Sequence, residues 1–157
     1  MAVSVIKHLK MNDIQANLTF VGNAFLKKEV VKFSKKLDVS NQIKILGHVD
    51  PKYLQGIYDD HDIFINTTHV DNQPRSVIEA MACGLPVVST NVGGCPYLIK
   101  DHSTGFLVND NDSEHMASCI IKILNDIPKT KQIVNSALLE LEIYNWHNIK
   151  KKWAKLI

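Results

Sequence analysis

The sequence contains a single arginine, Arg75, among its 18 basic residues, and its formal net charge is only +2. Arginine is the side chain that most often reads guanine edges and grips phosphates in nucleic-acid complexes. The small net charge and the single arginine therefore give no case for a nucleic-acid partner. Lysines recur at helical spacing between residues 27 and 36, and we interpret them as the solvated face of a helix.

Cysteine is also scarce. The three cysteines are an odd number with no Cys-x-x-Cys pair, which predicts reduced thiols and a cytoplasmic location. Cys95 lies beside a glycine turn, and we interpret it as a packing residue rather than a catalytic thiol. The seven histidines fall into no spacing typical of metal ligands, so no metal site is expected.

Long apolar runs are missing as well. No segment approaches the roughly 20 consecutive apolar residues of a membrane-spanning helix. The apolar start at Met1–Ile6 is too short for a signal peptide. Hydrophobic residues nevertheless make up 45% of the 157 residues, and charged residues make up 22%. These values are ordinary for a globular protein, and the length is sufficient for one domain with a sizeable core.

Short β-branched runs alternate with amphipathic segments along the chain. Strands are predicted at residues 18–21, 43–46, 63–66, 86–90 and 105–108. Helices are predicted at residues 2–11, 24–37, 51–60, 75–83, 113–125, 129–142 and 146–156, with a helical turn at 97–100. This alternation is typical of an α/β protein with a doubly wound, Rossmann-like, mostly parallel sheet. Such sheets bind their ligands at the carboxyl ends of the strands.

The segment Asp71–Gly94, DNQPRSVIEAMACGLPVVSTNVGG, carries most of the information about function. It reads as a loop, a short helix, a buried strand and a glycine turn at the carboxyl end of that strand. Asp71 precedes the helix and Glu79 lies inside it. Two carboxylates beside a strand end can hold vicinal hydroxyls, because each accepts two hydrogen bonds. The amides at the helix start, around Arg75 and Ser76, favour an anion.

A site for a diol beside a site for an anion indicates a nucleotide sugar. The residues alone leave a plainer interpretation open, in which Asp71 caps the helix and Glu79 is a solvated surface acid. A further alternative is a non-catalytic, flavodoxin-like nucleotide-binding or regulatory domain. An aspartate cluster at the end of the first strand would favour that class, and the sequence has none there.

The same segment resembles the signature region of family-4-type retaining glycosyltransferases of the GT-B fold. That family has two acidic residues separated by seven others, an alanine-methionine-alanine helix, a glycine-x-proline-valine-valine strand and a glycine pair. Four further segments extend the resemblance over most of the chain: LTFVGN at 18–23, IKILGHV at 43–49, HSTGFLVNDND at 102–112 and YNWHNIKKKW at 144–153. The sequence departs from the family at Asp71, where glutamate is usual, and at Tyr97, where many relatives have glutamate. Both departures bear on sugar recognition.

The resemblance implies a hexosyl-type glycosyltransferase that moves a sugar from a nucleoside diphosphate to an acceptor glycan or lipid-linked sugar. The anomeric configuration of the sugar is retained, and the product belongs to polysaccharide biosynthesis. It implies that Asp71 and Glu79 are the catalytic pair, with Glu79 on the ribose hydroxyls and Asp71 on the donor sugar. The implied donor-binding residues are Gly22, Asn23, His48, Val49, Asn72, Gln73, Pro74, Arg75 and Ser76. It implies no metal or other cofactor, because helix termini and basic side chains stabilise the leaving diphosphate in such enzymes.

By the same resemblance, residues 1–143 form the nucleotide-sugar-binding domain. Residues 144–157 form a helix that packs on an N-terminal acceptor domain, which this chain is expected to lack. The opening strand of the binding domain is expected to be absent too. The strands at 18–21 and 63–66 would then flank a gap, and would pair with each other, with residues 2–6 or with nothing. The chain is therefore expected to be truncated at its N-terminus and inactive alone. The resemblance also implies that the missing half holds the enzyme at a membrane surface.

Overall fold

The computed structural model describes residues 1–22 and 26–154. The candidate donor-binding residue Asn23 lies outside these residues. The α-helices are α1 Ala2–Met11, α2 Lys27–Lys36, α3 Leu54–Asp59, α4 Arg75–Ala82, α5 Cys95–Leu98, α6 Ser113–Asn125, α7 Ile127–Leu141 and α8 Trp146–Trp153. The strands are β1 Leu18–Val21, β2 Ile43–Gly47, β3 Phe64–Asn66, β4 Val87–Thr90 and β5 Phe106–Val108. Short 3₁₀ turns cover Ser40–Gln42, Pro51–Tyr53 and Glu142–Tyr144.

Every predicted strand is present. The helices predicted at residues 2–11 and 113–125 have the predicted ends, and the other predicted helices are present with shifted ends. The helix predicted from residue 51 begins as a 3₁₀ turn, in which Asp50 accepts a hydrogen bond from the Lys52 amide as a cap does. Pro128 was expected to lie ahead of a helix, but it lies in the first turn of α7, where its missing N–H leaves no bond unmade. The helical turn expected at 97–100 is displaced to α5.

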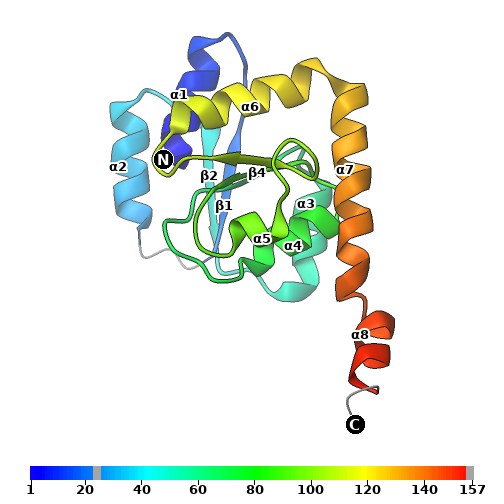
Figure 1. The fold of residues 1–157 in the computed structure, drawn as a ribbon. Coiled ribbons are helices and arrows are strands. Elements are labelled where there is room, and N and C mark those ends of the chain that lie inside the picture. The colour runs from blue at the N-terminus through cyan, green and yellow to red at the C-terminus, as the bar shows by residue number, and fades with distance from the viewer. Residues whose placement is uncertain (23–25, 155–157) are drawn as a thin grey trace.

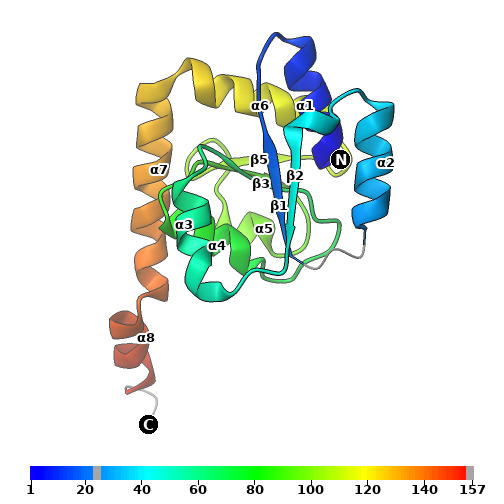
Figure 2. The same ribbon diagram turned by 180° about the vertical axis from the view of Figure 1, so that it is seen from behind.

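The α/β class and the parallel pairing are confirmed, but the strands do not form one continuous sheet. β1 pairs with β2 in one sheet, and β3, β4 and β5 form a second sheet in that order. Figure 2 shows the strands of the first sheet running across the direction of the second. Neighbouring strands rotate by roughly 20–25° each, so strands that are not adjacent in a sheet cross at larger angles. β1 and β3 have no partner on their facing edges within the described chain.

Of the three outcomes expected for these two edges, the structure therefore shows the one in which neither edge is paired among the described residues. Residues 2–6 are not recruited as a strand, because they belong to α1. The apolar side chains Val3, Ile6 and Leu9 recur on one face of α1 and are buried in the core that includes α6. A strand would point neighbouring side chains to opposite sides and would lose this burial.

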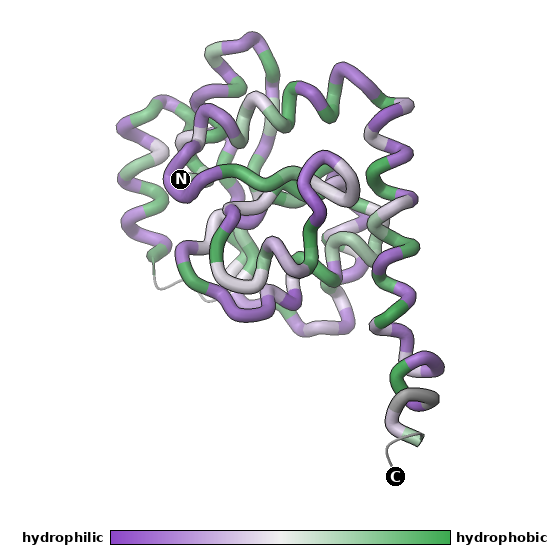
Figure 3. The backbone as a smooth tube through the Cα atoms, in the orientation of Figure 1, coloured by the Kyte–Doolittle hydropathy of each residue, from purple (hydrophilic) through white to green (hydrophobic). Residues whose placement is uncertain are grey.

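Two layers of helices enclose the sheet of β3, β4 and β5 (Figure 1). α1 and α6 cover one face, and α4 covers the other with α7 packed against it. The strand β4 contributes to both layers, since Val88 faces the first core and Val87 faces the second. This alternation is the one that a strand buried on both faces requires. Figure 3 shows hydrophobic residues along the central strands, whereas they alternate with hydrophilic residues along α6 and α7.

The end of α7 and the helix α8 extend away from the body of the domain (Figure 1). Trp146 and Trp153 expose 72% and 62% of their surface, and Leu139 on α7 exposes 72%. Leu156, the last residue of the helix predicted at 146–156, lies outside the described residues. No helix in the described part of the chain has the length and apolar character needed to cross a membrane.

Candidate functional site at the carboxyl ends of the strands

The loop after β3 and the loop after β4 are locked together at the carboxyl edge of the second sheet. The Gly94 amide donates a 2.8 Å hydrogen bond to the carbonyl of Asp71. A Cβ atom on Gly93 would collide with that same carbonyl, and one on Gly94 would collide with the carbonyl of Asn72. The glycine pair is therefore required for close approach of two backbones. This contact fixes the acidic loop that the sequence singled out.

Asp71 uses one carboxylate oxygen inside its own loop. Its Oδ1 accepts a 3.0 Å hydrogen bond from the Gln73 amide, two residues on. This is the local bond typical of aspartate in turns. The helix-capping role that the sequence left open for Asp71 is not observed, because Pro74 occupies the N-cap position of α4 and no described side chain caps that helix. Among the described residues, no hydrogen bond involves Oδ2, so this oxygen remains available to a ligand.

α4 begins directly after this loop, and its first turn presents free donors. Pro74 is buried at the N-cap position, and its carbonyl accepts the first helical bond, from the Val77 amide at 3.0 Å. Within the described chain the amides of Arg75 and Ser76 donate to no carbonyl. Unpaired amides and the positive end of the helix dipole favour an anion at this position. The Arg75 side chain is exposed beside them and forms no ion pair with a described residue.

A groove of about 520 Å³ runs between the unpaired edges of β1 and β3. Along the strands its walls are mostly apolar, and they include Phe20 and Ile65. At the carboxyl ends the lining becomes polar: Thr67, Thr68, Ser76 and Glu79. The structure therefore brings Glu79 and Ser76 together at one cavity, at the strand ends where the sequence predicted a ligand. Asp71 does not line this groove and belongs to the adjoining loop.

Glu79 has a partner that the sequence did not suggest. The Tyr58 hydroxyl on α3 donates a 3.0 Å hydrogen bond to Glu79 Oε2. Burial first, and then the bond to Glu79, raise the pKa of Tyr58 well above its usual value, so the hydroxyl stays protonated. Burial, followed by the charges of Asp59 and Glu79, also raises the pKa of the Cys83 thiol. Cys83 is thus not an activated nucleophile.

Three further predicted donor-binding residues, Gly22, His48 and Val49, lie at the carboxyl end of the first sheet. Gly22 has φ +126° and its amide donates a 2.8 Å hydrogen bond to the Gly47 carbonyl, which joins the loops after β1 and β2. His48 follows directly and is exposed, and Val49 is half-buried. Neither residue lines the groove.

His69 lies in the loop between β3 and Asp71. Its Nδ1 lies 2.7 Å from Oδ1 of Asp110, which follows β5. This pair ties the loop after β3 to the end of a strand that is distant in sequence. No sequence signal indicated Asp110, because the pair exists only through the order of β3, β4 and β5 in the sheet.

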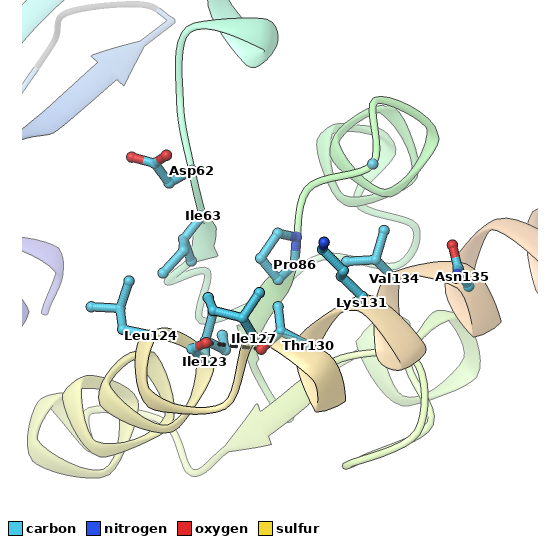
Figure 4. Close-up of a pocket in the computed structure, with 11 residues that line it drawn as sticks. Asp62, Ile63, Pro86, Ile123, Leu124, Ile127, Thr130, Lys131, Val134 and Asn135 are labelled. Atoms are coloured by element: carbon cyan, nitrogen blue, oxygen red, sulfur yellow. Dashed lines mark hydrogen bonds between the residues drawn. The ribbon is translucent and has the colours of Figure 1, made fainter.

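A second cavity, of about 390 Å³, lies at the opposite edge of the sheet (Figure 4). It is formed ahead of β3 and β4 by Ile63 and Pro86, against Ile123, Leu124 and Ile127 at the corner between α6 and α7. Thr130 Oγ1 closes this corner with a 2.9 Å hydrogen bond to the Ile123 carbonyl. The lining is mostly apolar, and no cluster of three or more His, Cys, Asp or Glu side chains that could hold a metal was found here or elsewhere among the described residues.

The fold and the site define a Rossmann-like α/β domain with a ligand-binding edge at the carboxyl ends of parallel strands. Residues 1–139 match the family described as glycosyl transferases group 1, and the chain belongs to this family. Its fold is that of the C-terminal domain of GT-B glycosyltransferases. The family match does not favour the flavodoxin-like alternative.

Two curated relatives and one solved structure illustrate the likeness. An N-acetyl-D-galactosaminyltransferase of Campylobacter jejuni, named for an undecaprenol-linked glycan, is 29% identical over 160 residues, which cover 100% of this chain and 43% of that protein. D-inositol 3-phosphate glycosyltransferase of Corynebacterium diphtheriae is 26% identical over 125 residues, covering 80% of this chain and 29% of the relative. HepE of Anabaena, crystallised with UDP and glucose, superposes with a TM-score of 0.85 over 99% of this chain and 44% of its own, at 24% identity. The chain thus spans less than half the length of each.

Proposed function

We propose that this chain is the donor-binding half of a retaining, family-4-type glycosyltransferase that transfers a hexosyl group from a nucleoside diphosphate sugar. The acceptor is a glycan or a lipid-linked sugar, reached through an N-terminal half, and the product belongs to polysaccharide or glycoconjugate biosynthesis. The observation that carries the proposal is the convergence of Glu79, Ser76 and the open first turn of α4 on one edge of the sheet. A carboxylate for a diol and free amides for an anion together match a nucleotide sugar.

Each group at this edge has a role in the proposal. Glu79 accepts hydrogen bonds from the ribose hydroxyls, and Asp71 accepts them from the donor sugar through the oxygen that its own loop leaves free. The loop residues Asn72 and Gln73, held by the glycine pair behind Asp71, face the sugar. Gly22, Asn23, His48 and Val49 lie toward the base at the end of the first sheet, with Asn23 placed by sequence alone.

The chemical step breaks the bond between the anomeric carbon and the diphosphate oxygen, and the diphosphate leaves with the electron pair. An acceptor hydroxyl forms the new bond on the same face of that carbon, and its proton passes to the leaving diphosphate. The amides of Arg75 and Ser76, the positive end of α4 and the Arg75 guanidinium lie where they would stabilise that charge. No metal or organic cofactor is part of the proposal. The three free thiols are in keeping with a cytoplasmic location, which we also propose.

A thermal-shift screen of the chain against UDP-, GDP- and ADP-sugars tests the proposal. A ligand that binds only the folded state raises its stability by about 2.7 kcal/mol at a hundredfold excess over Kd. We expect one nucleotide series to raise the melting temperature by several degrees and the others to leave it unchanged. Inorganic diphosphate and free glucose serve as controls. If no nucleotide sugar shifts the transition at millimolar concentration, the proposed function is wrong.

A further inference from the structure

Tyr58 is held rigidly at both ends. Its ring packs on Phe64 at the start of β3, with the ring centroids 6.1 Å apart and the planes tilted by 59°. It also packs against the apolar cluster beneath α4, which includes Val77 and Met81. The ring position is thus fixed by the core, and the hydroxyl is presented at the surface of that core.

The hydroxyl meets the acid to which the proposed function assigns the ribose. Tyr58 donates to Oε2 of Glu79, and no hydrogen bond involves Oε1 anywhere in the described chain. Glu79 is otherwise an exposed glutamate on a helix, free to sample several rotamers. A rigid donor on one oxygen restricts those rotamers and leaves the other oxygen open. Both residues line the groove between β1 and β3, beside Ser76 and Thr68.

We propose that Tyr58 is a positioning residue for the donor site, whose hydroxyl holds the Glu79 carboxylate so that its open oxygen receives the ribose hydroxyls. The inference rests on the proposed function and extends it to a residue on a different helix. Tyr58 contributes no charge and touches no reacting atom. It acts through Glu79 alone, by lowering the conformational cost of forming the bond to the diol.

The variant Tyr58→Phe removes the hydroxyl and keeps the ring packing. Its matched control is Tyr53→Phe, because Tyr53 is 62% exposed on the neighbouring 3₁₀ turn and does not line the groove. Calorimetry with UDP should show binding that is weaker by roughly three- to tenfold in Tyr58→Phe. Tyr53→Phe should bind UDP as the unchanged chain does.

A ligand without the diol separates positioning from a structural role. 2′,3′-Dideoxy-UDP lacks the hydroxyls that Glu79 would hold, so Tyr58→Phe should bind it as tightly as the unchanged chain does. In the Glu79→Gln background, Tyr58→Phe should weaken UDP binding little further. Equal weakening for UDP and for its dideoxy form, or additive losses in the double variant, would overturn the positioning role.

A pH titration without nucleotide shows whether the Tyr58–Glu79 pair exists, independently of whether the proposed function is correct. The ultraviolet absorbance of tyrosinate should reveal one tyrosine that ionises at unusually high pH. This ionisation should be absent from the titration of Tyr58→Phe. In Glu79→Gln it should occur at lower pH, because the bond and the charge of Glu79 no longer raise the pKa of Tyr58. If UDP binds the unchanged chain but Tyr58→Phe binds it equally well, the inference alone falls. If the titration shows the pair but none of UDP, GDP and ADP binds the chain, the proposed function is wrong and the positioning role is wrong with it.

Discussion

The Gly94 amide donates a hydrogen bond to the Asp71 carbonyl, and this bond joins the glycine turn after β4 to the acidic loop after β3. The two backbones approach so closely that a single added carbon on Gly94 would overlap the Asn72 carbonyl. The position of the acid therefore depends on a residue more than twenty positions away in the sequence.

Gly94→Ala should accordingly damage both stability and the site. Overpacking of this kind costs about 1–3 kcal/mol, because the backbone of one loop must move. Gly56→Ala is the matched control, since a Cβ atom there meets open space inside α3 and should stabilise the helix by about 0.5–1 kcal/mol. Urea denaturation of both variants measures the difference. A Gly94→Ala protein as stable as the unchanged chain would show that the two loops are not locked.

Glu79→Gln should weaken nucleotide binding more than it weakens folding. A hydrogen bond to a charged group is worth about 1.5–3 kcal/mol, which corresponds to a loss of roughly ten- to a hundredfold in affinity. Glu114→Gln replaces an exposed acid in the first turn of α6 and serves as the control. Calorimetry with UDP, or with the nucleotide that the thermal-shift screen selects, measures the effect. Equal affinities for Glu79→Gln and the unchanged chain would exclude the ribose role of Glu79.

Asp71→Asn should separate recognition of the sugar from recognition of the nucleotide. The asparagine oxygen can still accept the bond from the Gln73 amide, so the loop should keep its shape. We expect the affinity for the nucleoside diphosphate to remain and the added affinity for the intact nucleotide sugar to fall. Parallel calorimetric titrations with the two ligands measure this. If the affinities for both ligands fall together, the assignment of Asp71 to the sugar and Glu79 to the ribose is wrong.

The exposed apolar side chains of α7 and α8 should cause the chain to associate. Because the chain is proposed to be only the donor-binding half of the enzyme, it should also have no transferase activity on its own. Trp146 and Trp153 are both more than half exposed, and exposed apolar patches mark interaction surfaces. Replacing both tryptophans with serine should reduce the average mass seen by light scattering. Met11→Gln, which changes a single residue 68% exposed at the end of α1, should not. A monodisperse unchanged chain that transfers sugar would contradict this prediction.

Local features of the sequence were sufficient to predict most of the elements and the segment that carries the site. The buried strand β4 lies between Pro86 and the glycine pair, and α4 begins after Pro74. Neighbouring residues alone are therefore sufficient to predict where these two elements begin and end. Composition gave no reason to expect a nucleic-acid partner, and this remains a prediction. The ends of α3, α5 and α7 were less accurate, because 3₁₀ turns and prolines in a first turn follow backbone geometry that periodicity does not report.

The tertiary structure decided which groups meet. Tyr58 reaches Glu79 because α3 and α4 flank the same strand, and His69 reaches Asp110 because β4 lies between β3 and β5. The pairing of residues 2–6 was likewise decided by the folded chain, in which they belong to α1 and are buried against α6 and do not pair with β1. Periodicity predicts which face of an element is apolar, but not which distant element will cover it. Contacts of that kind depend on the order of the strands, which only the folded chain fixes.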